Sequence, residues 1–145
     1  MAKAKNGELC PICQTPIRLD DTKPLRNNGD ILTYLDHFRD KKQEFFICLS
    51  LDSGRRLIAR RVVTIGLLDA TLAHPREVFA GPLIDRAAAV IVAHNHPSGD
   101  ASPSKQDIET TQQLIAAGQL LGVPLQDHII ITTKTHYSFR QHSMI

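Results

Sequence analysis

A run of small or β-branched apolar residues, Ala87 to Ala93, leads directly into the sequence His-Asn-His-Pro-Ser-Gly. The length and composition of this run predict a buried strand in a sheet that is covered on both faces. Prolines and a glycine between positions 97 and 103 predict a loop, and apolar residues then recur at helical spacing from Ile108 to Leu121. We expect this helix to begin at Ser104. A buried strand joined through a loop to an amphipathic helix indicates an α/β fold, and the chain is long enough for one such domain.

Two histidines and an aspartate flank this loop at spacings that let them meet. Side chains two residues apart on a strand point to the same side, so His94 and His96 can face one ion at the end of the strand. Asp107 lies in the first turn of the helix, where a capping box with Ser104 is another explanation for an acid. Capping does not explain the paired histidines, so we predict a zinc site formed by His94, His96 and Asp107. Asp100, in the same loop as His96, is a less favoured alternative to Asp107.

The same stretch resembles the JAMM (JAB/MPN-type) metalloprotease signature, in which His-x-His is followed, after seven intervening residues, by Ser-x-x-Asp. The positions that match it are His94, His96, Ser104 and Asp107. Asn95 stands where that signature usually has a serine or a threonine. Within the superfamily, the loop sequence is similar to that of the RadC family, as are His-Pro-Arg-Glu-Val-Phe at 74–79 and Asp-His-Ile-Ile-Ile at 127–131. The resemblance covers residues 25–138, nearly all of the chain except its N-terminus.

This resemblance implies a JAB/MPN-like fold, a mixed β-sheet flanked by helices and similar to cytidine deaminases, in one domain over residues 24–145. It also implies a reaction, in which zinc and a glutamate base activate water to attack an amide in a peptide or isopeptide bond. Glu44 matches the position of that base, and Ser104 matches a hydroxyl that donates a hydrogen bond to the developing oxyanion. From the residues alone, 44–51 predicts a strand, and a solvated glutamate is the commoner explanation of Glu44. Zinc is the predicted cofactor, although manganese, cobalt and nickel suit the same ligands.

An arginine cluster favours a different class of function. It follows a turn at 52–54, at the start of the second strand of a predicted hairpin (56–66), and consists of Arg55, Arg56, Arg60 and Arg61. Solvated charges on an edge strand are the commoner explanation, and no aromatic residues are interleaved for stacking on bases. RadC-like proteins also carry a label of DNA repair. The alternatives to a hydrolase with a peptide or protein substrate are therefore a DNA-associated accessory module and a nuclease.

Composition and charge limit the expected location and partners. With 17 Lys and Arg against 15 Asp and Glu, the net charge of +2 neither attracts nor repels nucleic acid strongly. No apolar run approaches the length of about 18 residues that a membrane span needs, and the polar N-terminus contains no signal segment. We therefore expect a cytoplasmic protein that does not associate with membranes. A symmetric homodimer is compatible with such a domain, since it is the commonest soluble assembly.

The chain contains three cysteines, and this odd number agrees with a reducing compartment. Cys10 and Cys13 form Cys-Pro-Ile-Cys in an N-terminal arm at 1–23, which is half of a zinc-ribbon site. Because no second pair completes it, free thiols are the favoured interpretation and a second metal site is the alternative. Cys48 lies on the strand predicted at 44–51 and should be a small buried hydrophobic residue.

Two further helices are predicted outside the candidate site. Residues 30–41 show an apolar stripe at helical spacing, and Asp30 is the expected N-cap. A second helix should begin at a His74-Pro75 cap and run to Arg86. Gly81-Pro82 interrupts it, so we expect a kink or a break there.

Two closing strands are predicted near the C-terminus, at 128–133 and 137–140, separated by a Lys134-Thr135 turn. Asp127 and His128 would then stand at the start of a strand. There they either orient groups around the metal or belong to a turn with a satisfied histidine.

Overall fold

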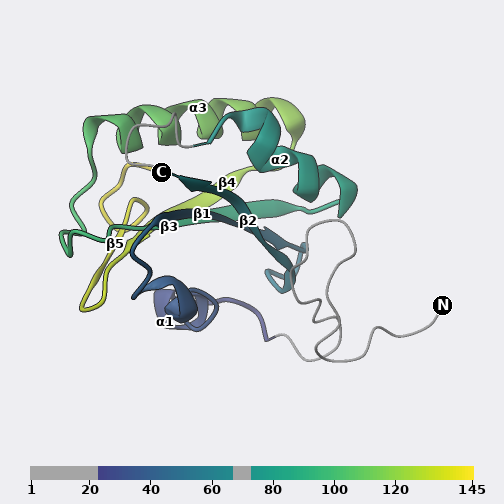
Figure 1. The fold of residues 1–145 in the computed structure, drawn as a ribbon. Helices are drawn as coiled ribbons and strands as arrows, with labels where there is room; N and C mark the ends of the chain where they lie inside the picture. Colours follow the sequence, from purple (N-terminus) through teal and green to yellow (C-terminus); the bar gives the residue numbers. More distant parts are fainter. Residues whose placement is uncertain (1–22, 67–72) are drawn as a thin grey trace.

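The fold is built on a mixed five-stranded sheet with the strand order β2-β1-β3-β4-β5 (Figure 1). The computed structural model describes residues 23–66 and 73–145. Its strands are β1 (Glu44–Leu51), β2 (Leu57–Gly66), β3 (Ala89–Asn95), β4 (Leu125–Ile131) and β5 (His136–Ser138). β3 and β4 run parallel, while the other neighbouring strands pair antiparallel. The predicted single α/β domain with a mixed sheet is confirmed.

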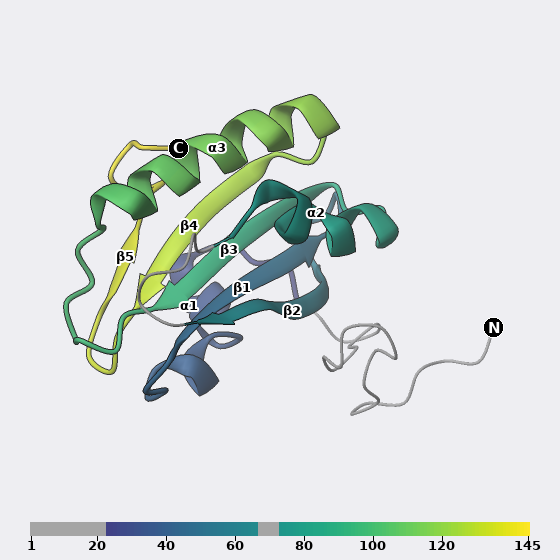
Figure 2. The ribbon, with the colours of Figure 1, turned by 45° about the horizontal axis from the view of Figure 1, so that its top comes forward.

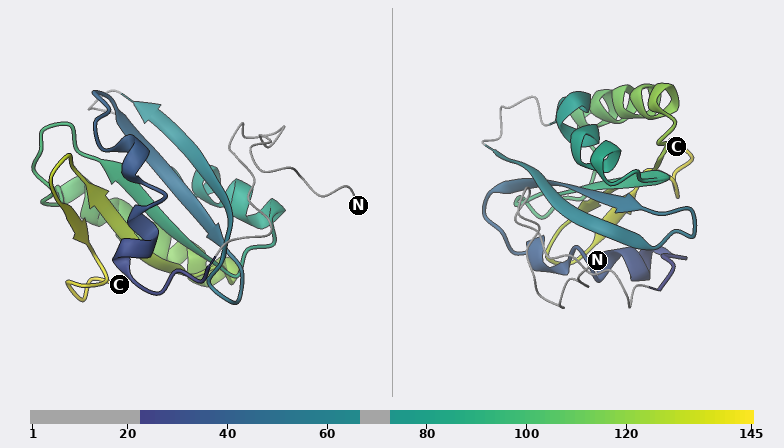
Figure 3. Two further views of the ribbon diagram at one scale, coloured as in Figure 1. Left: turned by 90° about the horizontal axis from the view of Figure 1, so that it is seen from below. Right: turned by 90° about the vertical axis from the view of Figure 1, so that its right-hand side faces the viewer.

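Helices cover both faces of the sheet. On one face lie α2 (Pro75–Ile84) and α3 (Lys105–Leu121), with α3 against β4 and α2 against β1 and β2 (Figure 2). The short α1 (Asn28–Leu32) and the 3₁₀ helix η1 (Asp36–Phe38) lie across the opposite face (Figure 3). Because each face buries its own apolar cluster, the central strand β3 is buried along its whole length. No helix in the described part of the chain is long and apolar enough to cross a membrane.

The β3-α3-β4 unit positions the loop that carries the histidines. α3 begins at a capping box, in which the Ser104 hydroxyl accepts the N–H of Asp107 and the Asp107 carboxylate accepts the N–H of Ser104. Gly122 ends the helix with φ of 71°, a left-handed conformation that glycine adopts without a steric penalty. The prediction of a helix that begins at Ser104 is confirmed.

The single helix predicted at 30–41, with Asp30 as its cap, is wrong. The chain instead forms α1 and η1, joined by tighter turns with i to i+3 hydrogen bonds. Asn27 is the cap of α1: its side chain accepts the N–H of Asp30, and the Asp30 carboxylate accepts the N–H of Asn27 in return. The side chains that this segment buries against the sheet are Ile31, Leu35 and Phe38. Their burial outweighs continuation of a regular helix.

The α2 helix contains a proline but is not broken. His74 caps it, as predicted, by accepting the N–H of Arg76. Of the kink or break expected at Gly81-Pro82, the break is absent, because Pro82 lies in the last turn and only one helical hydrogen bond is lost there. Gly81 allows a close approach between helix and strand, since a Cβ at this position would lie 2.5 Å from the Arg61 side chain.

The closing strands differ from the prediction in their boundaries. β4 begins at Leu125, so Asp127 and His128 lie inside a strand rather than at its start. As neighbours on a strand they point to opposite faces of the sheet. β5 covers His136–Ser138 rather than 137–140.

Two members of the arginine cluster, Arg60 and Arg61, lie on opposite faces of β2, while Arg55 and Arg56 precede this strand. The Arg60 guanidinium lies 5.3 Å from the centre of the Phe38 ring and donates to the carbonyl of Tyr34. Arg61 lies against α2, where it forms an ion pair with Asp85. Two of the four arginines therefore stabilise the packing of β2 against its neighbours.

We predict that Asp85→Ala lowers the free energy of unfolding by about 3 kcal/mol, because it removes the carboxylate that forms an ion pair with the largely buried Arg61 charge. The measurement is urea denaturation followed by circular dichroism. Glu77→Ala is the matched control, because the Arg76–Glu77 pair is exposed and such pairs contribute only about 0 to 1 kcal/mol. Equal losses in the two variants would contradict the structural role of Arg61.

Candidate metal centre

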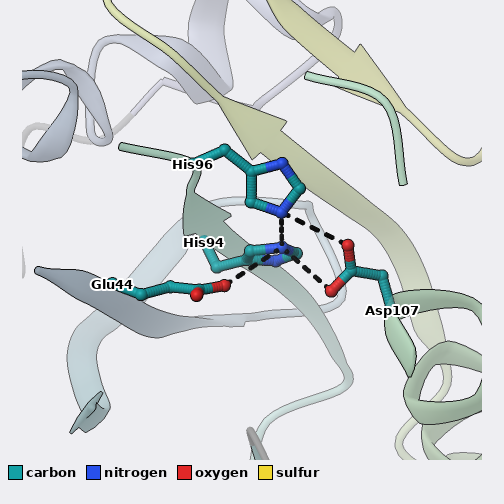
Figure 4. Close-up of side chains that lie close together, drawn as sticks. All are labelled: Glu44, His94, His96 and Asp107. Carbon is teal, nitrogen blue, oxygen red and sulfur yellow. Dashed lines mark hydrogen bonds and ion pairs between the residues drawn. The ribbon is translucent and has the colours of Figure 1, made fainter. Parts of the chain in front are cut away.

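Four ionisable side chains converge where β1 begins and β3 ends. They are Glu44 at the start of β1, His94 and His96 at the end of β3, and Asp107 in the first turn of α3. One ligand atom from each lies within 4.8 Å of the others. Figure 4 shows both rings and both carboxylates directed at a common centre. The structure thus brings together the three predicted zinc ligands and the predicted base.

The distances describe a compact set of donor atoms. The Nε2 atoms of His94 and His96 are 2.9 Å apart. Each of them lies 3.2 Å from a different oxygen of the Asp107 carboxylate. Glu44 stands farther away, with its Oε1 at 3.6 Å from His94 Nε2. Two imidazoles and a carboxylate with space for a further ligand are typical of catalytic zinc sites, so these residues fit a zinc ion.

The outer nitrogen of His96 is committed to a backbone carbonyl. Its Nδ1–H donates to the Asp100 carbonyl at 2.8 Å, so a neutral His96 directs the Nε2 lone pair at the cluster. Two nitrogen lone pairs at 2.9 Å repel each other unless a proton or a cation lies between them. The Asp100 carboxylate instead accepts the N–H of Ser102. The structure therefore places Asp107 in the cluster, and Asp100 contributes only its carbonyl.

The Asp107 carboxylate both caps α3 and contacts the two histidines of the cluster. Its Oδ2 accepts the N–H of Ser104 at 2.8 Å and faces His96, while its Oδ1 faces His94. The two explanations that the sequence offered for this aspartate are thus compatible. Because Ser104 Oγ accepts the N–H of Asp107, its hydroxyl proton remains available to another acceptor.

The environment shifts the pKa values of the two carboxyl groups in opposite directions. Burial alone would raise the pKa of Asp107, but hydrogen bonds from His94 and His96, formed when the Nε2 atoms of these rings carry protons, outweigh burial and hold this pKa far below its ordinary value. Burial raises the pKa of Glu44, and the nearby charges of the histidines offset only part of that rise. Burial alone would lower the pKa of His96, but the hydrogen bond to Asp107 and its charge raise it. Asp107 therefore stays ionised, while Glu44 is the stronger base.

The buried side chain of Asn95 fixes the segment that leads into Glu44. Its Oδ1 accepts the N–H of Phe45 at 2.7 Å. Its amide group donates to the carbonyls of Gln43 and Lys41 at 2.8 and 3.3 Å. The sequence showed Asn95 only as a departure from the JAMM signature, and no local pattern indicates such a contact because the partners lie about 50 residues away.

Of the two residues expected near the metal, only His128 contacts the cluster. Its Nε2 lies 2.8 Å from His94 Nδ1, and burial lowers the pKa of His128 well below its ordinary value. Asp127 points to the other face of the sheet. Its carboxylate accepts the Ser138 hydroxyl at 2.6 Å and the N–H of Arg140 at 3.0 Å, and so holds the segment after β5.

A cavity of about 410 Å³ opens onto the cluster. Glu44, His96 and Ser104 line it, whereas the His94 side chain is completely buried behind them. A second cavity of about 420 Å³ lies beside α1 and β4 and contains none of the four clustered residues. The Glu44 carboxylate, the His96 imidazole and the Ser104 hydroxyl are therefore accessible from the same side.

Cys48, the one cysteine among the described residues, is not part of this cluster. Cys10 and Cys13 fall outside the described residues, so a second metal site there stays a prediction. Cys48 is buried, as predicted, and burial raises the pKa of its thiol to about 12.

The molecule is a mixed-sheet α/β domain with a candidate metal centre, in which two imidazoles and one carboxylate come from strand ends and the second carboxylate from the start of α3. Residues 25–144 match the family described as RadC-like JAB domain, and the chain belongs to this family. A UPF0758 protein of Methanosarcina mazei is 36% identical over the whole chain, and one of Methanosarcina acetivorans is 45% identical. A UPF0758 protein of Trichodesmium erythraeum is 50% identical over 68% of the chain.

The chain spans only part of these relatives. The alignments cover 66% of the length of the two Methanosarcina proteins and 41% of the Trichodesmium protein. Membership of the family establishes the kind of domain, while none of these names specifies an activity.

We predict that Asn95→Ala lowers the free energy of unfolding by about 3 kcal/mol, because it leaves one backbone N–H and two carbonyls around Glu44 without their partner. Urea denaturation measures this loss. Gln112→Ala, at an exposed position of α3, is the control and should change stability by less than about 0.5 kcal/mol. A loss of that small size in Asn95→Ala would show that the contacts do not hold the segment.

Proposed function

We propose that the chain is a zinc-dependent hydrolase of the JAMM metallopeptidase type, which cleaves an amide in a peptide or isopeptide bond. The observation that supports this proposal is the convergence of two histidines and two carboxylates on one centre that opens to a cavity. Structural zinc sites are normally closed by four protein ligands. Here Glu44 stands farther from His94 than Asp107 does and lines the cavity, which suits a base better than a fourth ligand.

The residues divide into ligands and a base. A zinc ion held by His94, His96 and Asp107 would lower the pKa of water to about 7 and polarise a carbonyl oxygen. Glu44 takes a proton from the attacking water and returns it to the leaving amine. The opposite pKa shifts of Glu44 and Asp107 support this division, because a raised pKa makes a better proton acceptor.

The Ser104 hydroxyl supplies a hydrogen bond to the oxygen on which negative charge develops. It lines the cavity next to His96 and Asp107, and the capping box fixes its position. Its oxygen is engaged by the N–H of Asp107, so its proton is free to donate. A donor fixed before the reaction stabilises such a charge without reorganisation.

The charge around the cavity favours an amide over a phosphodiester substrate. Lys105 is the one lysine or arginine among the described residues that line this cavity. Phosphate backbones are bound chiefly by several Lys and Arg side chains. Of the four arginines that prompted the nucleic-acid alternative, Arg60 and Arg61 are engaged with Phe38 and Asp85.

Glu44→Gln should keep the zinc and lose at least about 100-fold of the turnover, because glutamine cannot accept the proton. Zinc is measured by elemental analysis after dialysis, and turnover with peptide and isopeptide-linked substrates. Glu109→Gln, on the exposed side of α3, is the control and should retain activity. Full activity of Glu44→Gln would remove the base from this mechanism, and loss of its zinc would make Glu44 a ligand.

His96→Ala should reduce the zinc content from about one ion per chain to almost none, because a three-ligand site loses one of its two imidazoles. The same elemental analysis on Cys10→Ser/Cys13→Ser separates the cluster from the N-terminal cysteine pair. Zinc that persists in His96→Ala but disappears with the cysteines would contradict the proposed centre. A DNA-associated accessory module would then be the better hypothesis.

A further inference from the structure

A chain of hydrogen bonds leads from His94 through the interior to the backbone of α3. His94 Nδ1 lies 2.8 Å from His128 Nε2. His128 Nδ1 lies 2.7 Å from the Thr111 hydroxyl, which donates to the Asp107 carbonyl at 2.7 Å. All three side chains are buried, so these polar groups depend on one another for hydrogen bonds.

Packing against aromatic rings holds His128 in this arrangement. Its ring stacks on Phe139, with centroids 4.7 Å apart, and meets Phe46 at an angle of 66° and 5.7 Å. Phe46 also stacks on His94 at 5.9 Å. Because the rings are fixed between these neighbours, the variable that remains is which nitrogen of each imidazole carries the proton.

The far end of the chain determines the direction of all its hydrogen bonds. A carbonyl oxygen only accepts, so the Thr111 hydroxyl can be hydrogen-bonded to both Asp107 and His128 only if its single proton points to Asp107. The hydroxyl oxygen then accepts from His128, which puts the proton of a neutral His128 on Nδ1 and leaves Nε2 as an acceptor. His94 must therefore donate from Nδ1, and its Nε2 presents a lone pair to the cluster.

If the hydrogen bonds between Thr111, His128 and His94 ran in the opposite direction, His94 could not bind a cation. If His128 donated from Nε2, a neutral His94 would carry its proton on the Nε2 that faces the cluster, where it could not bind a cation. Thr111 would then donate to His128 and lose its hydrogen bond to Asp107. Only the first order keeps the Thr111 hydroxyl hydrogen-bonded to both Asp107 and His128.

We propose that Thr111 and His128 are positioning residues that select the tautomer of His94 able to bind a cation. This inference rests on the ligand role of His94 in the proposed function. Thr111 makes no contact with the donor atoms of the cluster and acts through His128. Partners of this kind typically change metal affinity by about 10- to 100-fold.

Thr111→Val tests the inference, because valine keeps the shape of the side chain and removes the hydroxyl. Thr111→Ser is the matched control that keeps the hydroxyl. The tautomers are read from long-range proton–nitrogen NMR spectra of the whole chain with isotope-labelled histidine, without metal and at alkaline pH. Wild type and Thr111→Ser should carry the protons of His94 and His128 on Nδ1, whereas Thr111→Val should show a substantial population of His94 with its proton on Nε2.

Zinc affinity is the second measurement, by competition with a chromophoric chelator. It should weaken by about 10- to 100-fold in Thr111→Val and stay within about threefold of wild type in Thr111→Ser. Unchanged tautomers or an unchanged zinc affinity in Thr111→Val would overturn the inference, as would an equal loss in both variants. If wild type binds no zinc, the proposed function fails. The tautomers then still show whether Thr111 sets the direction of the hydrogen bonds between His128 and His94.

Discussion

The carboxylate of Asp107 is the group on which both the start of α3 and the cluster depend. It accepts the N–H of Ser104 at 2.8 Å and lies 3.2 Å from each histidine nitrogen. The first turn of a helix needs acceptors because its N–H groups have no partner within the helix. Two adjacent imidazoles need a negative charge for a different reason. A proton or a cation between them carries positive charge, and a nearby carboxylate balances that charge. One buried charge meets both needs, so the position of α3 and the geometry of the site cannot change independently.

The pairing of the strands brings Glu44, the remaining carboxylate of the cluster, to the histidines. β1 runs antiparallel to β3, which places the start of one strand beside the end of the other. Phe46 pairs with His94 in this register, and Glu44 consequently reaches the edge of the sheet where the histidines lie. The parallel pairing of β3 with β4 brings His128 behind His94 in the same way. Each strand next to β3 therefore contributes one side chain to the surroundings of the ligands.

Features with local signals could be predicted from the sequence, and those that depend on register could not. The apolar run, the Gly/Pro loop and the helical spacing each lie within one segment, so β3, α3 and the placement of the ligand residues follow from them. The expectation for Glu44 came from family resemblance, because a glutamate at a strand start has no distinctive pattern. Thr111 looks like an ordinary helix residue until α3 is packed on β4. The division of 30–41 into two short turns likewise depends on which side chains reach the sheet.

The His-Asn-His tripeptide at 94–96 places both the two histidines proposed as ligands and the proposed base, Glu44. Alternation along the strand directs the two histidines to the cluster and Asn95 to the other side. There Asn95 accepts one hydrogen bond and donates two, all to backbone groups around Glu44. A serine or threonine, which the JAMM signature usually has at this position, carries a single donor and could not serve both carbonyls. The departure of this chain from the signature therefore matches a local requirement: an amide is needed to anchor the segment that carries Glu44. Because one tripeptide positions both histidines and anchors the segment of Glu44, the separation between the proposed base and the proposed histidine ligands depends on a single strand end rather than on two independent loops.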